Sequence, residues 1–316
     1  MLPILVYIQS NQILVVGSSN TDMVVMTDHF PVPGETILGG KFLMNPGGKG
    51  ANQAVAAARL GGRVAFISKL GKDIFGEQAV KNFVKEGIDV SGIVSDPDHP
   101  SGVALITVDK NAENSIVVAP GSNMSLGTED IDRNLSLFEN VGILLMQLEI
   151  PLKTIEYAAS ISYDRGTKVI LNPAPAAVLP DNLYSYLYLI TPNETETEFL
   201  TGIRINDESS ARDAAEKLKS KGVKNVIITM GAAGAYVFTD QVQKMIPAPV
   251  VKAIDTTAAG DTFNGALAVA LSEGKDMEKA VIFANKAAAL AVTRMGAQSS
   301  VPTLHELMVY KFIEKE

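Results

Sequence analysis

The segment Asp255-Thr-Thr-Ala-Ala-Gly-Asp261-Thr-Phe-Asn-Gly holds the residue types best suited to chemistry in this chain. Its small residues let the backbone approach a ligand closely, and a helical pattern follows from Phe263. A helix N-terminus presents unpaired N–H groups and the positive end of the helix dipole, which favour a phosphate or developing negative charge. Asp261 would lie beside this anion hole as a carboxylate able to accept a proton from a hydroxyl. The segment therefore indicates phosphoryl transfer to an alcohol.

A second glycine-rich segment, Asn45-Pro-Gly-Gly-Lys-Gly-Ala-Asn-Gln53, precedes an Ala-rich helical pattern and predicts another helix N-terminus with exposed amides. It is not a P-loop, because neither it nor Gly71-Lys-Asp-Ile-Phe-Gly76 has Gly-x4-Gly-Lys-Ser/Thr. No Gly-x-Gly-x-x-Gly follows the first strand either, which weakens a dinucleotide-binding interpretation. A glycine-rich turn before a packed helix fits the pattern equally well.

Polar residues follow several apolar, strand-like runs. Asn20 and Asp22 come after the first run and suit the hydroxyl groups of a polyol, although such residues are more often turn formers. Glu149 ends another run and needs a polar partner, either a sugar hydroxyl or the helix after Pro151 that it would cap. Glu196 opens a helical pattern, where the dipole alone favours it, and it could also hold the waters of a Mg²⁺ ion.

The elements that must position these residues alternate between strands and helices. Continuous Val, Ile and Leu runs separated by helical patterns predict an α/β fold with a doubly wound, mostly parallel sheet flanked by helices. Ligands bind such sheets beyond the carboxyl ends of the strands. The predicted strands span 13–17, 65–69, 142–148, 168–171, 188–191, 225–229 and 235–239, and the helices 49–60, 76–86, 152–165, 194–201 and 209–221.

Two stretches interrupt this alternation, with strands at 22–26 and 35–44 and at 102–109 and 115–119. They predict a small β-sheet lid, formed by insertions at about 22–44 and 102–119, over a single α/β domain that spans 13–316. Two surface ribbons without function are the alternative. Residues 1–12 are expected to form an N-terminal extension. The apolar residues of the lid suggest a homodimer through the lids; they are Val24, Val25, Leu38, Phe42, Val103 and Leu105.

Composition excludes several classes of function. The net charge of -8 and the lack of a basic run disfavour a nucleic acid or an anionic membrane as partner. The absence of cysteine excludes disulfides and thiol catalysis, and three widely separated histidines disfavour a His-rich metal site. The apolar start at residues 1–8 lacks a basic region and is shorter than a spanning helix, so a cytoplasmic protein is expected.

Taken together and in this order, the segments resemble the PfkB carbohydrate kinase family from about Ile13 to the C-terminus. The motifs at 47–54 and 255–265 bracket the resemblance, and those at 20–22, 146–149 and 192–196 lie between them. The resemblance implies a kinase that uses ATP and Mg²⁺, with K⁺ as an activator, to phosphorylate the 5-hydroxyl of D-ribose. A family kinase for 2-deoxyribose, fructose or a nucleoside is the first alternative, and a non-catalytic sugar- or nucleotide-binding sensor the second.

The resemblance also implies a role for each site residue. Asp261 would be the base, beside an anion hole formed by Ala258, Ala259 and Gly260. The ribose site would comprise Asn20, Thr21, Asp22, Gly48, Lys49, Gly50, Ala51, Asn52, Glu149 and Asp261. ATP would lie against Asn193, Thr229, Met230, Gly231, Ala232, Ala233, Gly234, Gly260, Asp261 and Asn285, with Glu196 organising Mg²⁺. K⁺ would be bound, largely through carbonyls, by Asp255, Thr257, Ala291, Arg294, Gly296 and Ser300.

Overall fold

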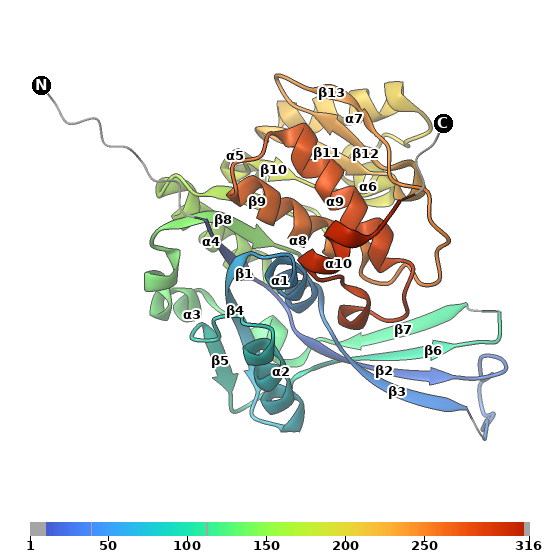
Figure 1. The fold of residues 1–316 in the computed structure, drawn as a ribbon. Coiled ribbons are helices and arrows are strands. Elements are labelled where there is room, and N and C mark those ends of the chain that lie inside the picture. The colour runs from blue at the N-terminus through green and yellow to red at the C-terminus, as the bar shows by residue number, and fades with distance from the viewer. Residues whose placement is uncertain (1–10, 39, 112, 313–316) are drawn as a thin grey trace, which may run out of the picture.

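The computed structural model describes residues 11–38, 40–111 and 113–312. The strands of its main sheet are β1 Gln12–Val16, β4 Arg63–Gly71, β5 Ile93–Asp96, β8 Val141–Met146, β9 Lys168–Leu171, β10 Leu189–Ile190, β11 Asn225–Thr229, β12 Ala235–Phe238 and β13 Gln243–Ile246. They form one nine-stranded sheet in the order β13-β12-β11-β10-β9-β8-β1-β4-β5 (Figure 1). Strands β5 to β11 in this order pair in parallel, and β12 and β13 add an antiparallel edge. The predicted doubly wound, mostly parallel sheet is confirmed.

Helices cover both faces of this sheet. They are α1 Lys49–Arg59, α2 Ile74–Lys85, α3 Thr128–Arg133, α4 Leu152–Asp164, α5 Asp181–Tyr186, α6 Glu194–Thr201, α7 Glu208–Ser220, α8 Ala259–Ser272, α9 Met277–Ala291 and α10 Leu304–Val309, with short 3-10 helices η1 Gly121–Ser125, η2 Leu135–Phe138, η3 Gly231–Ala233 and η4 Gln298–Ser300. Successive strand side chains point to opposite faces. In β1, Ile13 and Val15 therefore join the core under α1, α8 and α9, while Leu14 and Val16 join the core under α4 and α7.

The predicted strands and helices of the sheet all form, with boundaries that shift by a few residues at most. The sequence reading missed the edge strands β5 and β13. It also placed the start of α8 at Phe263, whereas the helix begins at Ala259, so that Asp261 lies in its first turn. Gln12 belongs to β1, so the predicted extension of 1–12 was too long, and its residues 1–10 lie outside the described part of the chain.

Both insertions join in a single four-stranded sheet, which confirms the predicted lid as a structural unit. Its strands are β2 Asn20–Met26, β3 Lys41–Gly47, β6 Gly102–Val108 and β7 Asn114–Ala119, in the order β3-β2-β6-β7. The sheet projects from the α/β body, with its inner end next to the body (Figure 1). The predicted strand at 35–44 was wrong at its start, because β3 begins at Lys41, after Gly40 with its positive φ of 109°. Among the described residues, no helix is both long and apolar enough to cross a membrane.

Candidate active site

Three carboxylates converge where the lid meets the body. Asp22 lies on β2, Glu149 follows β8, and Asp261 lies in the first turn of α8. Burial, together with the charges of Glu149 and Asp261, raises the pKa of Asp22 to about 6. The carboxylate of Asp22 has no hydrogen-bond partner among the described residues, although it is largely removed from water. Such a group is stabilised by a ligand whose hydroxyls donate to it.

Glu149 fastens the turn after β1 to the start of α1. Its Oε2 accepts hydrogen bonds from Ser18 Oγ at 2.5 Å and from the Lys49 backbone N–H at 2.9 Å. The alternative role as a cap of the following helix is wrong, because α4 begins after Pro151 without any side-chain cap. A Cβ on Gly50 would lie 2.5 Å from the Ser18 nitrogen, so the close contact of these two segments requires glycine there.

Lys49 supplies the positive charge of this site. Burial lowers the pKa of its ammonium, but the charges of Asp261, Glu149 and Glu196 outweigh burial and hold the pKa above its usual value. Lys49 is therefore charged, and its field reaches Asp261 and Glu149, which are expected to bind the sugar, as well as Glu196, which is expected to bind Mg²⁺.

Asp261 is held by the side chains of α1. Its Oδ2 accepts from Asn52 Nδ2 and its Oδ1 accepts from Gln53 Nε2, both at 2.9 Å. The side-chain oxygen Oδ1 of Asn52 is buried and has no hydrogen-bond partner among the described residues. This oxygen is an acceptor for a ligand hydroxyl beside the carboxylate. The arrangement orients a base and leaves hydrogen-bonding capacity directed at a polyol.

The start of α8 provides free backbone donors next to this base. Ala258 has a left-handed backbone, with a φ of 58°, which is strained for a residue other than glycine and is often found at functional sites. The Ala259 N–H donates to the Thr256 carbonyl at 3.2 Å, so this amide is engaged within the turn rather than free as the sequence suggested. The N–H groups of Gly260 and Asp261 have no partner in the described structure, and they remain as anion donors.

A buried network of amides below Asp261 was missed by the sequence reading. Gln53 accepts from Gln147 Nε2 at 2.6 Å and donates to Asn172 Oδ1 at 3.1 Å. Asn264 Nδ2 donates to the Gly260 carbonyl at 2.8 Å and so fixes the first turn of α8. Two of these residues could have been found, because Gln53 and Asn264 lie inside the two glycine-rich motifs. Gln147 lies in the motif at 146–149 but was given no role there, and nothing local marks Asn172.

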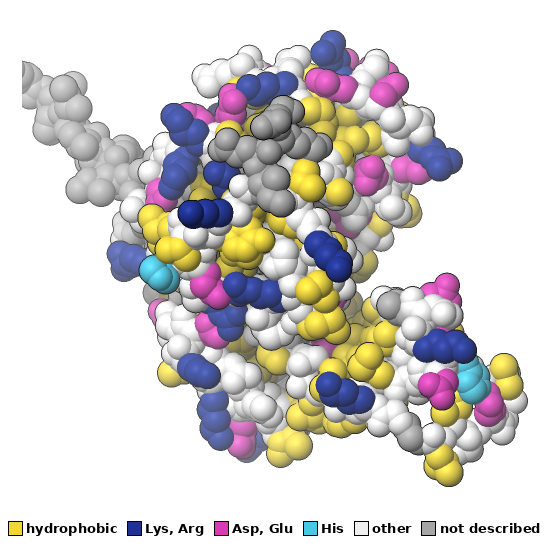
Figure 2. Space-filling model, turned by 45° about the vertical axis from the view of Figure 1, so that its right-hand side comes forward, with side chains coloured by type: hydrophobic (Ala, Val, Ile, Leu, Met, Phe, Trp, Pro, Cys, Tyr) yellow, Lys and Arg dark blue, Asp and Glu magenta, His cyan; other side chains and the backbone are white. Residues whose placement is uncertain are grey.

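A cavity of about 600 Å³ opens beside the free amides of α8. It brings together Gly260 and most of the residues assigned to ATP, while Met230, Ala233 and Asp261 are not on its wall. Asn285 lines it, but its Nδ2 donates to the Ile246 carbonyl at 3.0 Å and ties α9 to the end of β13. Figure 2 shows a hollow between the lid and the body. The residues on the wall are Asn193, Thr229, Gly231, Ala232, Gly234, Gly260 and Asn285, together with apolar groups such as Val250 and Phe263.

The sequence profile described as pfkB family carbohydrate kinase matches residues 10–304 of this chain. The chain belongs to the pfkB family of carbohydrate kinases. It is an ATP-dependent sugar kinase, in agreement with a cavity beside an oriented base and free amides.

Relatives within the family share nearly the whole chain. A ribokinase of Haemophilus influenzae is 47% identical over 94% of this chain and 97% of its own length. A deoxyribokinase of Salmonella typhi is 39% identical over 94% of this chain and 98% of its own length. The solved structure of the Arabidopsis thaliana ribokinase complexed with ribose and ATP is 32% identical, with a TM-score of 0.89 over 96% of this chain and 100% of that chain.

Glu196, which is expected to organise Mg²⁺ in this pfkB-family kinase, also caps the helix α6. Glu196 and Asn193 form a capping box at the start of α6, which confirms the capping interpretation. Burial raises the pKa of Glu196, while the Asn193 backbone N–H and the Lys49 charge oppose this effect. Its neighbours Asn193 and Thr195 line the cavity beside α8, and a single carboxylate next to that cavity fits a Mg²⁺ ion that keeps most of its waters.

Asp255 joins the two loops expected to hold a monovalent cation. Its Oδ1 accepts from the Thr257 N–H at 2.9 Å and its Oδ2 accepts from the Gly296 N–H at 2.8 Å. Burial acts to raise the pKa of Asp255, but these hydrogen bonds outweigh it and hold the pKa below its usual value. No group of three His, Asp or Glu residues that could hold a metal occurs in the described ranges. A single ionised carboxylate fits a weakly bound monovalent cation better than a transition metal.

Proposed function

We propose that this pfkB-family kinase transfers the γ-phosphoryl group of ATP to the 5-hydroxyl of D-ribose. The observation that carries the proposal is the half-buried carboxylate of Asp22, which has no hydrogen-bond partner among the described residues and is close enough to Asp261 to be affected by its charge. The unpaired acceptor on Asn52 adds a second hydrogen-bonding position for the same polyol. The similarity to a ribokinase complexed with ribose and ATP supports the choice of substrates.

In the proposed reaction, Asp22 and Asn52 orient the sugar while Asp261 accepts the proton of the 5-hydroxyl. The new bond joins that oxygen to the γ-phosphorus as the bond from phosphorus to the bridging oxygen of ADP breaks. Negative charge on the transferred group is stabilised by the N–H groups of Gly260 and Asp261, the dipole of α8 and the ammonium of Lys49. Bound Mg²⁺, held through water by Glu196, would neutralise phosphate charge.

A substrate panel tests the assignment. We expect kcat/KM for D-ribose to exceed that for fructose or a nucleoside by at least about a hundredfold, because a site with fixed hydrogen-bonding groups rejects sugars that leave them unpaired. The measurement is ADP release with each sugar at fixed ATP. A higher kcat/KM for 2-deoxyribose, the substrate class of the similar Salmonella deoxyribokinase, would reassign the sugar while keeping the chemistry. No turnover with any sugar would favour a non-catalytic sensor.

We also propose that the loops joined by Asp255 bind K⁺ and thereby shape the anion hole. The carbonyls of Ala291, Arg294 and Gly296 and the Ser300 segment would surround the ion, with Asp255 and Thr257 on the facing loop. Replacing Na⁺ by K⁺ at constant ionic strength should raise kcat at least about threefold, measured with Tris salts of ATP to exclude other cations. Equal rates in the two salts would contradict a selective cation site.

A homodimer through the lids is the third element of the proposal. The strand registers place apolar side chains next to one another across the four strands of the lid. The pairs are Met44 with Met23, Met23 with Leu105, Leu105 with Val117, and Phe42 with Val25. These side chains therefore share the sheet face opposite Asp22, and Phe42, Leu105 and Val117 are 58%, 55% and 65% exposed. Hydrophobic side chains on the lid are also visible in Figure 2. Sedimentation should give a dimer, and Leu105→Asp should shift it to monomer.

The use of ATP as cosubstrate is consistent with a cytoplasmic location.

A further inference from the structure

Arg59, the last residue of α1, binds the segment that follows the proposed cation loop. Its Nη1 donates to the backbone carbonyl of Gln298 at 2.6 Å and to that of Val301 at 3.0 Å. Its other nitrogens form a bidentate ion pair with Glu86, the C-cap residue of α2, at 2.8 and 2.6 Å. One planar guanidinium therefore connects α1, α2 and η4, and a lysine ammonium could not reproduce this geometry.

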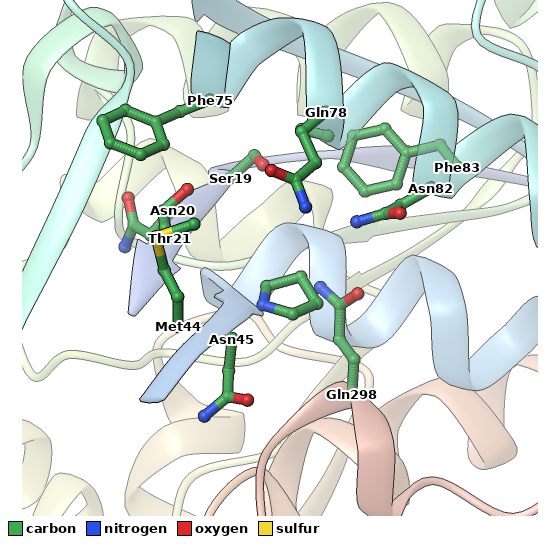
Figure 3. Close-up of a pocket in the computed structure, with 12 residues that line it drawn as sticks. Ser19, Asn20, Thr21, Met44, Asn45, Phe75, Gln78, Asn82, Phe83 and Gln298 are labelled. Atoms are coloured by element: carbon green, nitrogen blue, oxygen red, sulfur yellow. The ribbon is translucent and has the colours of Figure 1, made fainter. Parts of the chain in front are cut away.

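The side chains of η4 do not hold the segment in place by themselves. Gln298 is buried, yet its Nε2 has no hydrogen-bond partner within the described residues. Figure 3 shows its amide directed toward Gln78 and Asn82 of α2, in a pocket that Asn45 of β3 also lines. The backbone hydrogen bonds from Arg59 are thus the polar contacts that fasten the Gln298 end of the segment to α1.

The same segment is fastened at its other end to the anion-hole loop. Gly296 donates to Asp255 Oδ2 at 2.8 Å, and the Val292 carbonyl accepts from the Ile254 N–H at 2.7 Å. Residues 292–301 are therefore held between Asp255 and Arg59, and every carbonyl assigned to the cation beyond Ala291 lies within this stretch. Arg59 lies seven residues after Asn52, roughly 10 Å along α1, so it cannot touch the sugar or the transferred phosphate.

We propose that Arg59 is a positioning residue for monovalent-cation binding. By fixing the carbonyls of Gln298 and Val301 it sets the curvature of residues 292–301, and thereby the spacing of the carbonyls that face the ion. The inference rests on the proposed cation site. Arg59 would connect the C-terminal end of α1 to the ion, while Asn52 and Gln53, near the N-terminal end of the same helix, orient Asp261.

The test measures cation binding without turnover. A bound ion raises the midpoint of thermal unfolding, so the midpoint is recorded against KCl concentration, with choline chloride keeping the ionic strength constant. For Arg59→Lys the KCl concentration that gives half of the rise should increase at least about fivefold, as expected for the loss of a hydrogen bond to a fixed carbonyl. In parallel, kcat at saturating KCl and KM for ribose should stay within about twofold of the parent enzyme.

Controls separate the possible outcomes. Arg133→Lys, which changes an exposed guanidinium paired with the buried Asp130 far from the cation loops, should leave the KCl titration unchanged. Glu86→Gln keeps the guanidinium of Arg59 but removes its charged partner, so the half-point, which is the KCl concentration that gives half of the rise, should increase about twofold. If Arg59→Lys does not fold, the half-point of Glu86→Gln tests the role of Arg59 instead. An unchanged half-point in these variants overturns the role of Arg59. No K⁺-specific rise in the parent enzyme overturns the cation site itself, whatever the variants do.

Discussion

Replacing Asp261 by Asn lowers kcat at least about a hundredfold, while the dissociation constants of ribose and ATP stay within several-fold. The variant removes an oxygen of the carboxylate that is proposed to accept the 5-hydroxyl proton, but it keeps the size of the side chain. In the parent protein, the two carboxylate oxygens accept hydrogen bonds from Asn52 Nδ2 and Gln53 Nε2. In the variant, an NH₂ group replaces one of these oxygens and faces one of the two donors. Rapid-quench kinetics with ATP and ribose, alongside equilibrium titrations, separates the chemical step from binding.

The matched control is Asp213→Asn, an exposed carboxylate on α7 far from the site, which should retain the parent kcat. If Asp261→Asn turns over within threefold of the parent enzyme, Asp261 is not the base. A fall in kcat accompanied by an equal loss of ribose affinity would instead assign Asp261 mainly to sugar binding.

Replacing Asp22 by Asn raises KM for ribose at least about tenfold and also raises the thermal unfolding midpoint by at least about 2 °C at pH 8. The first effect follows because the ionised carboxylate is a stronger acceptor of sugar hydroxyls than an amide. The second follows from the pKa of Asp22, which is raised from 3.8 to about 6 in the folded protein. Ionised Asp22 therefore destabilises the ligand-free fold at pH 8, and its removal relieves this cost.

The pKa of Asp22 sets how the stability of the fold and the KM for ribose change with pH. Between pH 3.8 and about 6 the folded protein holds the Asp22 proton while the unfolded chain releases it, so this group makes folding less favourable as pH rises through that window. Ribose binding prefers the ionised form, so KM should rise as pH falls below about 6 in the parent enzyme and less in Asp22→Asn. Asp28→Asn, an exposed residue of the same insertion, should change neither quantity. A KM and a melting midpoint that both match those of the parent would remove Asp22 from the sugar site.

The sequence alone determined the α/β class, the positions of the two glycine-rich motifs and the acceptor chemistry of Asp261. These features depend on short-range signals, such as apolar runs, glycine at positive φ and acidic residues at helix starts. Local signals also explain the errors. Gly40 interrupts the pattern that suggested a strand at 35–44, and the small residues before Phe263 concealed the true start of α8 at Ala259.

The tertiary structure alone decided which of these groups act together. The hydrogen bond from Asn52 to Asp261 joins residues 209 positions apart, and the contact between Arg59 and Gln298 joins residues 239 apart. No local pattern marks Asn172 below Asp261, the engagement of the Ala259 amide or the missing partner of Asp22, and the motif at 146–149 did not indicate the contact of Gln147. These features follow from burial and from tertiary packing, such as that of α1 against α8, which bring distant side chains to a common place and remove them from water. A sequence specifies the chemistry of each group, but the fold determines its neighbours, and the neighbours set its pKa, its orientation and its function.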